Sequence, residues 1–496
     1  MQTNILEYLE NTAKRLPSKL AFSNGKEGMS FGEVIKGAAA IGSFIASKGI
    51  YREPVLIFMD KHPRTVTAFF GVIYAGCYYV CIDEKMPDAR IAAIIDNLGP
   101  RLMISDKKNF SRAEKIFAGE VALYDDAAAF EIDRTALLRV RERQIDTDAI
   151  YVVFTSGSTG VPKGVVAAHR SVIEYTEHLC LALGFSENTV FGNQTPLYFD
   201  APLKEIMPTL KFGATTYFVP KVCFSFPVKL IEYLNQYKIN TVCWVVSAFV
   251  QVSSLGALEK FKPEYLTTVA FGSEVFPKKQ YDIWRQTLPN AAFYNLYGPT
   301  EATGMSCYWR ADRELSENEP IPVGRPFKNT RILLIDEDGK EADEGEICIG
   351  GTCLTMGYYN NPEKTAEVFV QNPTNAAYPD LVYRTGDIGR YNEHGELVFV
   401  CRRDSQIKHM GHRIELGEIE SAAMKDDGVS RAVCLYDAEN KRILLFYTGA
   451  VEEDALRTQI VAFLPKYMMP TLIKHLAAFP LTDNGKVDRR GLIANF

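Results

Sequence analysis

Short apolar runs alternate with helical patterns through most of the chain, and this alternation limits the folds that it can adopt. The run EPVLIFM at 53–59 precedes a helical pattern at 65–76, and the run INTVCWVV at 239–246 follows one at 227–237. Strands that alternate with helices are typical of layered α/β structures. We therefore predict a fold of the α/β class.

The length and a change of pattern indicate more than one domain. The chain has 496 residues, whereas a single hydrophobic core stops growing at about 250–300 residues. After about Arg310, strand patterns are separated by Asp-Gly and His-Gly turns, which predicts a β-rich segment. Towards the C-terminus, two apolar strand patterns lie between helical patterns at 415–426 and 452–464, which is typical of a small α+β domain.

Composition and charge argue against several classes of protein. The net charge is −6, with acidic and basic residues interspersed, so we expect no nucleic-acid partner and no basic membrane patch. The N-terminus lacks a secretory pattern, and the most apolar window, 67–83, is too short for a membrane span and contains two glycines. The ten cysteines include no CxxC pair. We therefore expect buried thiols in a cytoplasmic protein, and no zinc site.

The stretch YVVFTSGSTGVPKGVV, at 151–166, has the composition of a phosphate-binding loop. Glycines let backbone N–H groups approach an anion, hydroxyls add donors, and Lys163 adds a positive charge. The stretch is not a Walker motif, and taken alone it would also suit a flexible surface loop. The residues that we assign to phosphate binding are Thr155, Ser156, Gly157, Ser158, Thr159 and Gly160.

Further motifs follow the loop in a fixed order. In this order and at this spacing, the set resembles the adenylate-forming superfamily, which includes the adenylation domains of nonribosomal peptide synthetases, the acyl-CoA synthetases and the luciferases. The resemblance covers essentially the whole chain. The motifs that carry it are FDAPLKE at 199–205, NLYGPTEAT at 295–303, YRTGDIGRY at 383–391, RRDSQIKHMGHRIELGEIE at 402–420, LPKYMMP at 464–470 and NGKVDRRGL at 484–492.

The resemblance implies a two-domain enzyme that uses ATP and Mg²⁺. Residues 1–402 would form a large domain of layered α/β subdomains with the β-rich segment, and residues 403–496 a mobile lid with its hinge at Asp404. A substrate carboxylate would attack the α-phosphorus of ATP and release pyrophosphate, and a thiol would then displace AMP to give a thioester. Lys408 and Gly411 would reach the nucleotide and thiol side in the second reaction.

The resemblance also assigns catalytic roles to four residues. Lys163 and Thr300 would contact phosphate, and Glu301 would bind Mg²⁺, a hard cation that prefers carboxylate oxygen. Lys486 would bridge the substrate carboxylate and the phosphate. Without the family, Lys486 would read as a solvated tail residue. A surface carboxylate is the alternative for Glu301, but the apolar residues that flank its motif argue against it.

Three further residues are assigned to the nucleoside. Tyr297 would lie on the adenine face, although a packed core tyrosine is nearly as consistent with the sequence. Asp387 would accept both ribose hydroxyls, and Arg402 would also face the nucleotide. Without the family, Asp387 would read as a turn residue after Gly386.

The motif FDAPLKE indicates an amino-acid substrate. Asp200 matches the aspartate that pairs with the α-ammonium group in amino-acid-activating members and that acyl-CoA synthetases generally lack. Lys204 would suit an acidic side chain such as glutamate, but a lysine whose head reaches water leaves a hydrophobic amino acid open. The other pocket positions implied by the resemblance are Ala201, Cys243, Val269, Phe271, Leu296, Gly304 and Met305.

The sequence has no carrier-protein serine motif, so we expect the acceptor thiol to be the phosphopantetheine of a separate or detached carrier protein. A stand-alone D-alanine–carrier-protein ligase is one alternative. Another is an acyl-CoA ligase for a small organic acid, against which Asp200 argues. A non-catalytic binding protein would be expected to have lost some of the assigned catalytic residues, all of which are present.

Overall fold

The structure, a computed structural model, describes residues 2–156, 162–316, 319–403, 406–480, 487 and 489–494. Its contacts divide the chain into two compact units. The first unit comprises Met1–Glu84, Leu98–Val153 and Gly164–Arg403, and the second comprises Lys85–Asn97, Phe154–Lys163 and Asp404–Phe496. Both units combine helices with strands, so the predicted α/β class is confirmed. The second unit also takes in two short segments that the sequence assigned to the large domain.

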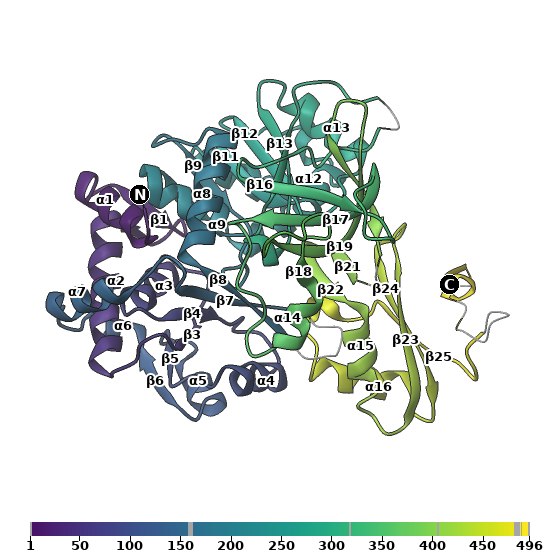
Figure 1. The fold of residues 1–496 in the computed structure, drawn as a ribbon, viewed down its shortest axis with the longest axis horizontal. Helices are drawn as coiled ribbons and strands as arrows, with labels where there is room; N and C mark the ends of the chain where they lie inside the picture. The colour runs from purple at the N-terminus through teal and green to yellow at the C-terminus, as the bar shows by residue number, and fades with distance from the viewer. Residues whose placement is uncertain are drawn as a thin grey trace. The chain divides into compact units, whose positions relative to one another are not determined.

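A six-stranded sheet lies in the N-terminal third of the chain (Figure 1). In spatial order its strands are β6 (Glu120–Leu123), β5 (Leu102–Ser105), β3 (Pro54–Phe58), β4 (Tyr78–Cys81), β7 (Ala149–Thr155) and β8 (Lys163–Ala168). Helix α3 (Pro63–Tyr74) connects β3 to β4, and almost all of its side chains are buried, which explains why its sequence is apolar on every face. The apolar window at 67–83 is thus a buried helix that leads into a strand. Within the described part of the chain, no helix is both long enough and apolar enough to cross a membrane.

A nine-stranded sheet forms the middle of the first unit. In spatial order its strands are β15 (Arg325–Pro326), β14 (Cys307–Arg310), β13 (Ala292–Tyr297), β12 (Thr268–Gly272), β11 (Thr241–Val245), β9 (Val190–Asn193), β10 (Thr215–Phe218), β1 (Leu20–Ser23) and β2 (Gly28–Ser30). The strands from β13 to β1 are parallel, and the outer strands β14, β15 and β2 run antiparallel to their neighbours. Parallel strands need crossover connections, and the helical patterns between the apolar runs supply them.

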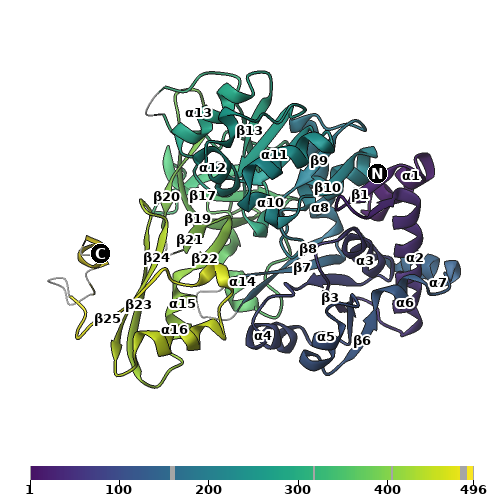
Figure 2. The same cartoon turned by 180° about the vertical axis from the view of Figure 1, so that it is seen from behind.

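Helices cover both faces of this sheet (Figures 1 and 2). The covering helices are α8 (His169–Leu183), α9 (Leu203–Phe212), α11 (Pro227–Gln236), α12 (Val246–Ser254) and α13 (Lys278–Thr287). On one face, α8 and α9 share a core with Cys243 and Ala270. On the other face, α11, α12 and α13 share a core with Trp244 and Phe271. Successive residues of a strand point to opposite faces, so neighbours in β11 and β12 belong to different cores.

The β-rich segment predicted after Arg310 is confirmed. Its sheet contains β16 (Thr330–Ile335), β17 (Glu344–Gly351), β18 (Phe369–Gln371), β19 (Leu381–Tyr391) and β20 (Leu397–Arg402). The predicted Asp-Gly and His-Gly turns join β16 to β17 and β19 to β20. Gly339 and Gly395 adopt positive φ angles of 77° and 66° there, a conformation that glycine tolerates best.

The second unit has a core of its own. Its elements are α4 (Asp88–Leu98), β21 (Gln406–His409), β22 (His412–Glu415), α15 (Leu416–Ala423), β23 (Val429–Asp437), β24 (Arg442–Gly449), α16 (Glu453–Val461), β25 (Leu472–His475) and α17 (Arg489–Ala494). Ile419, Cys434, Leu445 and Leu456 are fully buried in this core. The two helices and two strands predicted for the C-terminal region are therefore confirmed.

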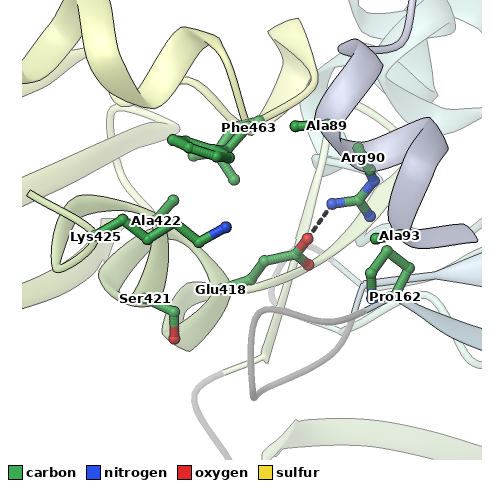
Figure 3. Close-up of a pocket in the computed structure, with 10 residues that line it drawn as sticks. Ala89, Arg90, Ala93, Pro162, Glu418, Ser421, Ala422, Lys425 and Phe463 are labelled. Atoms are coloured by element: carbon green, nitrogen blue, oxygen red, sulfur yellow. Dashed lines mark hydrogen bonds and ion pairs between the residues drawn. The ribbon is translucent and has the colours of Figure 1, made fainter. Parts of the chain in front are cut away.

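A buried ion pair joins two distant segments of the second unit. Arg90 of α4 and Glu418 of α15 are in contact, and their side chains are only 5% and 2% exposed. They lie in the wall of a cavity of about 130 Å³ (Figure 3). Across this cavity, the Lys425 ammonium lies 3.9 Å from the ring centre of Phe463. Removing one member of a buried ion pair is strongly destabilising, because it leaves the other charge without its counterion. The contact between Arg90 and Glu418 therefore links α4 to α15.

Candidate functional site

The carboxylate of Asp387 brings together side chains from three strands. Asp387 lies in β19 and is 4% exposed. The hydroxyl of Tyr297, at the end of β13, donates to Oδ2 over 2.7 Å, and Nη1 of Arg402, at the end of β20, donates to Oδ1 over 2.6 Å. Burial and the charge of Asp387 hold the pKa of Tyr297 well above its usual value, so the hydroxyl remains a donor. The three residues assigned to the nucleoside are therefore in direct contact.

The sequence TGD sets the position of this carboxylate. Gly386 has a φ of 74°, and its N–H donates to Oε1 of Glu346 over 3.0 Å. The hydroxyl of Thr385 accepts from the N–H of Asp387 over 3.0 Å and donates to the carbonyl of Ile347 over 2.7 Å. These local bonds satisfy the backbone and leave the carboxylate of Asp387 for its side-chain partners.

Glu301 is held in a short 3₁₀ turn, η2 (Thr300–Ala302), directly after β13. It is fully buried, and the hydroxyl of Tyr358 donates to its Oε1 over 2.7 Å. Its carboxylate suits Mg²⁺, which is often bound by one or two carboxylates together with substrate phosphates and water. Among the residues that the structure describes, no group of three or more His, Cys, Asp or Glu is placed to hold a metal.

Asp200 lies beside this turn, just before α9. Its Oδ2 is buried and has no hydrogen-bond partner in the described part of the chain. Burial raises the pKa of Asp200, and a hydrogen bond from Thr300 and the charge of Lys204 partly offset that effect. A Cβ placed on Gly304 would lie 3.6 Å from the unpaired oxygen, so the backbone at Gly304 passes close to it. The structure thus places Asp200 next to the turn that holds Glu301.

Lys204 and its neighbour Glu205 lie in the first turn of α9. They are 3% and 0% exposed. The charge of Lys204 acts on Asp200 and on Cys243, so these three predicted pocket residues lie close together. Leu296 and Met305 belong to the same core cluster. Glu205 was not selected from the sequence, although an acidic residue beside Lys204 in an otherwise apolar helix was a usable signal.

The structure does not bring Val269 and Phe271 together with Cys243. Both side chains pack in the core that α11, α12 and α13 cover, where Phe271 meets the ring of Phe249. The residue of β12 that pairs with Cys243 and faces α8 and α9 is Ala270. The difference is one residue of strand register, which moves a side chain to the opposite face.

The described ends of the phosphate loop contact the β21–β22 hairpin within the second unit. The hydroxyl of Ser156 donates to the carbonyl of Arg413 over 2.8 Å. Nζ of Lys163 lies 3.5 Å from Oε1 of Glu415, and both side chains are at most 10% exposed. Thr155 contacts the carbonyl of Lys163 over 3.5 Å. A phosphate at Lys163 would therefore compete with a carboxylate that already holds it.

The hairpin also contains the two residues expected to act in the second half-reaction. Lys408 lies in β21, and Gly411 lies in the two-residue turn to β22 with a φ of 78°. Met410, before it, also has a positive φ, as a type I′ hairpin turn requires. The predicted site residues that lie outside the described residues are Gly157, Ser158, Thr159, Gly160, Asp404 and Lys486.

Several sequence relatives of the chain are much longer proteins. The chain is 30% identical over 500 residues to Tyrocidine synthase 2 of Brevibacillus parabrevis, an alignment that covers 99% of this chain. It spans only 14% of the length of that relative.

Solved structures share the fold across the whole chain. A structure of holo-PA1221, described as a nonribosomal peptide synthetase protein containing adenylation and PCP domains, superposes with a TM-score of 0.85 at 24% identity, covering 99% of this chain and 84% of its own. The Vibrio cholerae adenylation domain AlmE, in complex with glycyl-adenosine-5′-phosphate, gives a TM-score of 0.86 at 19% identity, covering 100% and 98%.

The family itself is established by sequence. The family model described as AMP-binding enzyme matches residues 9–359, which is most of the chain and includes the phosphate loop, Asp200 and the turn with Glu301. The resemblance read from the motifs is thereby confirmed, and the chain belongs to the family of AMP-binding enzymes.

Proposed function

We propose that this enzyme activates an α-amino acid as its adenylate, with release of pyrophosphate, and transfers the aminoacyl group to the phosphopantetheine thiol of a carrier protein. ATP as the nucleotide follows from the family. The substrate class, an α-amino acid, and the acceptor, a carrier protein, are what we propose beyond the family. The observation that carries it is the buried, unpaired carboxylate oxygen of Asp200.

An α-ammonium group would satisfy that oxygen. A buried acceptor without a partner costs about 1–3 kcal/mol, and a charge-assisted hydrogen bond contributes about 1.5–3 kcal/mol. A fatty or aryl acid has no donor to offer at this position, so it would leave Asp200 unpaired. The hydrogen bond from Thr300 to Asp200 would hold the amino-acid end of the site next to the phosphates.

The first half-reaction needs alignment and charge neutralisation more than an activated protein nucleophile. The substrate carboxylate is already ionised, and its oxygen would attack the α-phosphorus of ATP while the bond to pyrophosphate breaks. In this proposal Asp200 fixes the ammonium end, Asp387 fixes the ribose, and Lys486 meets the carboxylate and phosphate. Glu301 would hold Mg²⁺, which neutralises phosphate charge when it is bound.

The second half-reaction calls for a thiol acceptor. The solved relative PA1221 carries its adenylation and PCP domains in one protein. We extend this arrangement to the present chain as an acceptor on a separate or detached carrier. In this proposal residues 1–402 and 403–496 are the two moving parts, Asp404 is the hinge, and Lys408 and Gly411 act in the thiol-accepting state.

ATP–pyrophosphate exchange tests the first half-reaction. The screen covers the twenty amino acids and D-alanine, with acetate and benzoate as organic-acid references. We expect exchange with one amino acid or a small group of them, and none with the references. Mass spectrometry of a phosphopantetheine-loaded carrier then tests the transfer. Exchange with acetate or benzoate alone would overturn the assignment to amino acids.

A further inference from the structure

A buried set of charged side chains surrounds the first turn of α9, and part of it belongs to no site assigned above. We propose that Glu205 is a positioning residue that sets the charge Lys204 presents to the substrate side chain, so that the site accepts an amino acid whose side chain ends in an anion and accepts it best while Glu205 is protonated. The inference rests on the proposed function.

Lys204 provides the cation. Its side chain is 3% exposed, and its charge acts on Asp200, Glu205 and Cys243. Asp200 lies close enough for the two charges to act on each other, but in the proposed function that carboxylate is taken by the α-ammonium of the substrate. A cation in a largely buried site is stabilised by an opposite charge nearby. An anionic group on the substrate would supply that charge.

Glu205 can weaken the preference of the Lys204 site for an anionic substrate side chain. Its Oε2 accepts from Nδ2 of Asn193 over 3.2 Å, while its Oε1 is buried without a partner in the described part of the chain. Adjacent residues of a helix do not face one another. Their charges nevertheless act on each other. An ionised Glu205 would therefore offset the charge of Lys204 without occupying its hydrogen-bonding positions.

Lys61 and Asn193 hold Glu205 in place from outside the helix. Nζ of Lys61 donates to the carbonyl oxygens of Asn193 and Gln194 over 3.1 and 2.9 Å. Its charge also acts on Glu205. The end of β9 is thereby fixed, and with it the amide of Asn193 that reaches the carboxyl group.

The protonation of Glu205 changes in the neutral range. Burial raises the pKa of Glu205 to about 7, and the nearby ammonium groups of Lys204 and Lys61 partly offset this effect. Burial also lowers the pKa of Lys61 to about 7. The other titratable groups facing Glu205 are Tyr175 of α8 and Cys243 of β11, and burial raises the pKa of both. As the pH rises through 7, Glu205 gains a negative charge and Lys61 loses a positive one, and both changes disfavour an anionic substrate.

The test compares glutamate with glutamine in ATP–pyrophosphate exchange at pH 6, 7 and 8. Both reactions use ATP, and both amino acids carry the same α-amino and α-carboxyl groups. The titration of these groups therefore affects both kcat/KM values equally and does not change their ratio. In the wild type we expect the ratio to favour glutamate at pH 6 and to fall about tenfold by pH 8, which corresponds to one pKa unit of coupling. Glu205→Gln keeps an acceptor for Asn193 but cannot ionise, so most of the fall should disappear. Lys204→Met should abolish the preference for glutamate at every pH.

Each other result has a defined meaning. A wild-type ratio that is constant from pH 6 to 8, or a Glu205→Gln enzyme with the same fall, would overturn the role of Glu205. A wild type that prefers glutamine or an apolar amino acid at every pH would overturn the assignment of an anionic side chain, while amino-acid activation would stand. Exchange with organic acids only would overturn the proposed function as well. The wild-type profile decides the question even if a variant fails to fold.

Discussion

The replacement Asp387→Asn tests the nucleoside end of the site. The structure already places one partner on each carboxylate oxygen, Tyr297 on Oδ2 and Arg402 on Oδ1. An ionised carboxylate has about four lone-pair positions, so one position on each oxygen remains for a ribose hydroxyl. Hydrogen bonds to a charged group contribute about 1.5–3 kcal/mol each, against about 0.5–1.5 kcal/mol for neutral ones.

The magnitude follows from these two bonds. Loss of the charge should cost about 1–1.5 kcal/mol per hydroxyl, or about 2–3 kcal/mol in total, which lowers kcat/KM for ATP about 30- to 150-fold. Pyrophosphate exchange with ATP and with 2′-deoxy-ATP isolates the contribution of the 2′-hydroxyl. The preference for ATP should shrink about fivefold to tenfold in Asp387→Asn.

A matched control separates this role from loss of structure. Tyr297→Phe removes the 2.7 Å bond to the same carboxylate but leaves its charge, so the preference for ATP over 2′-deoxy-ATP should be kept. If Asp387→Asn discriminates between the two nucleotides as strongly as the wild type does, Asp387 does not bind the ribose hydroxyls.

Three further predictions concern stability and the first half-reaction. Arg90→Met should destabilise the second unit by about 3–5 kcal/mol in denaturant unfolding because it removes the charge that pairs with the buried carboxylate of Glu418, and adding Glu418→Leu should recover most of this loss. Burial lowers the pKa of His169 to about 3, and its Nδ1 accepts from the N–H of Ile5. The resulting stabilisation is present above the unfolded pKa of about 6.5 and is lost as the pH falls towards 3, so urea unfolding should show about 2 kcal/mol less stability at pH 5 than at pH 7, and His169→Gln should remove this difference. Lys486→Ala should lower pyrophosphate exchange about 100- to 1,000-fold, as the loss of an oxyanion donor does, and unchanged exchange would refute its role.

Features that depend on local sequence were predictable. Apolar runs and helical periods predicted the α/β class, and the Asp-Gly and His-Gly pairs predicted the turns of the β-rich segment. The motifs predicted that Tyr297, Asp387 and Arg402 share one site, and the structure places them in contact. Each of these inferences needed only residues close together in the sequence or a motif with a fixed order.

Strand register in the nine-stranded sheet was not predictable in the same way. The strand TVAFG at 268–272 is buried on both faces, so its sequence is almost continuously apolar and does not reveal which residues face α9. Only the pairing of Cys243 with Ala270 places Val269 and Phe271 in the other core.

Contacts between distant segments could not be predicted from the sequence either. Lys61 approaches the end of β9 from a loop more than 130 residues earlier in the chain. The pairing of Arg90 with Glu418 likewise joins segments that no local pattern connects. Such contacts are decided by how whole elements pack, and residue type or spacing gives no sign of them.

The central claim is that Asp200 binds the α-ammonium group of an amino acid. The most direct measurement compares the preferred amino acid with the same acid lacking its amino group, such as glutamate with glutarate, in pyrophosphate exchange. The account predicts that the wild type favours the amino acid by about tenfold to a hundredfold or more, the value of one charge-assisted hydrogen bond, and that Asp200→Ala loses this preference. Equal activation of the two acids by the wild type would contradict the account and identify the enzyme as a ligase for simple carboxylic acids.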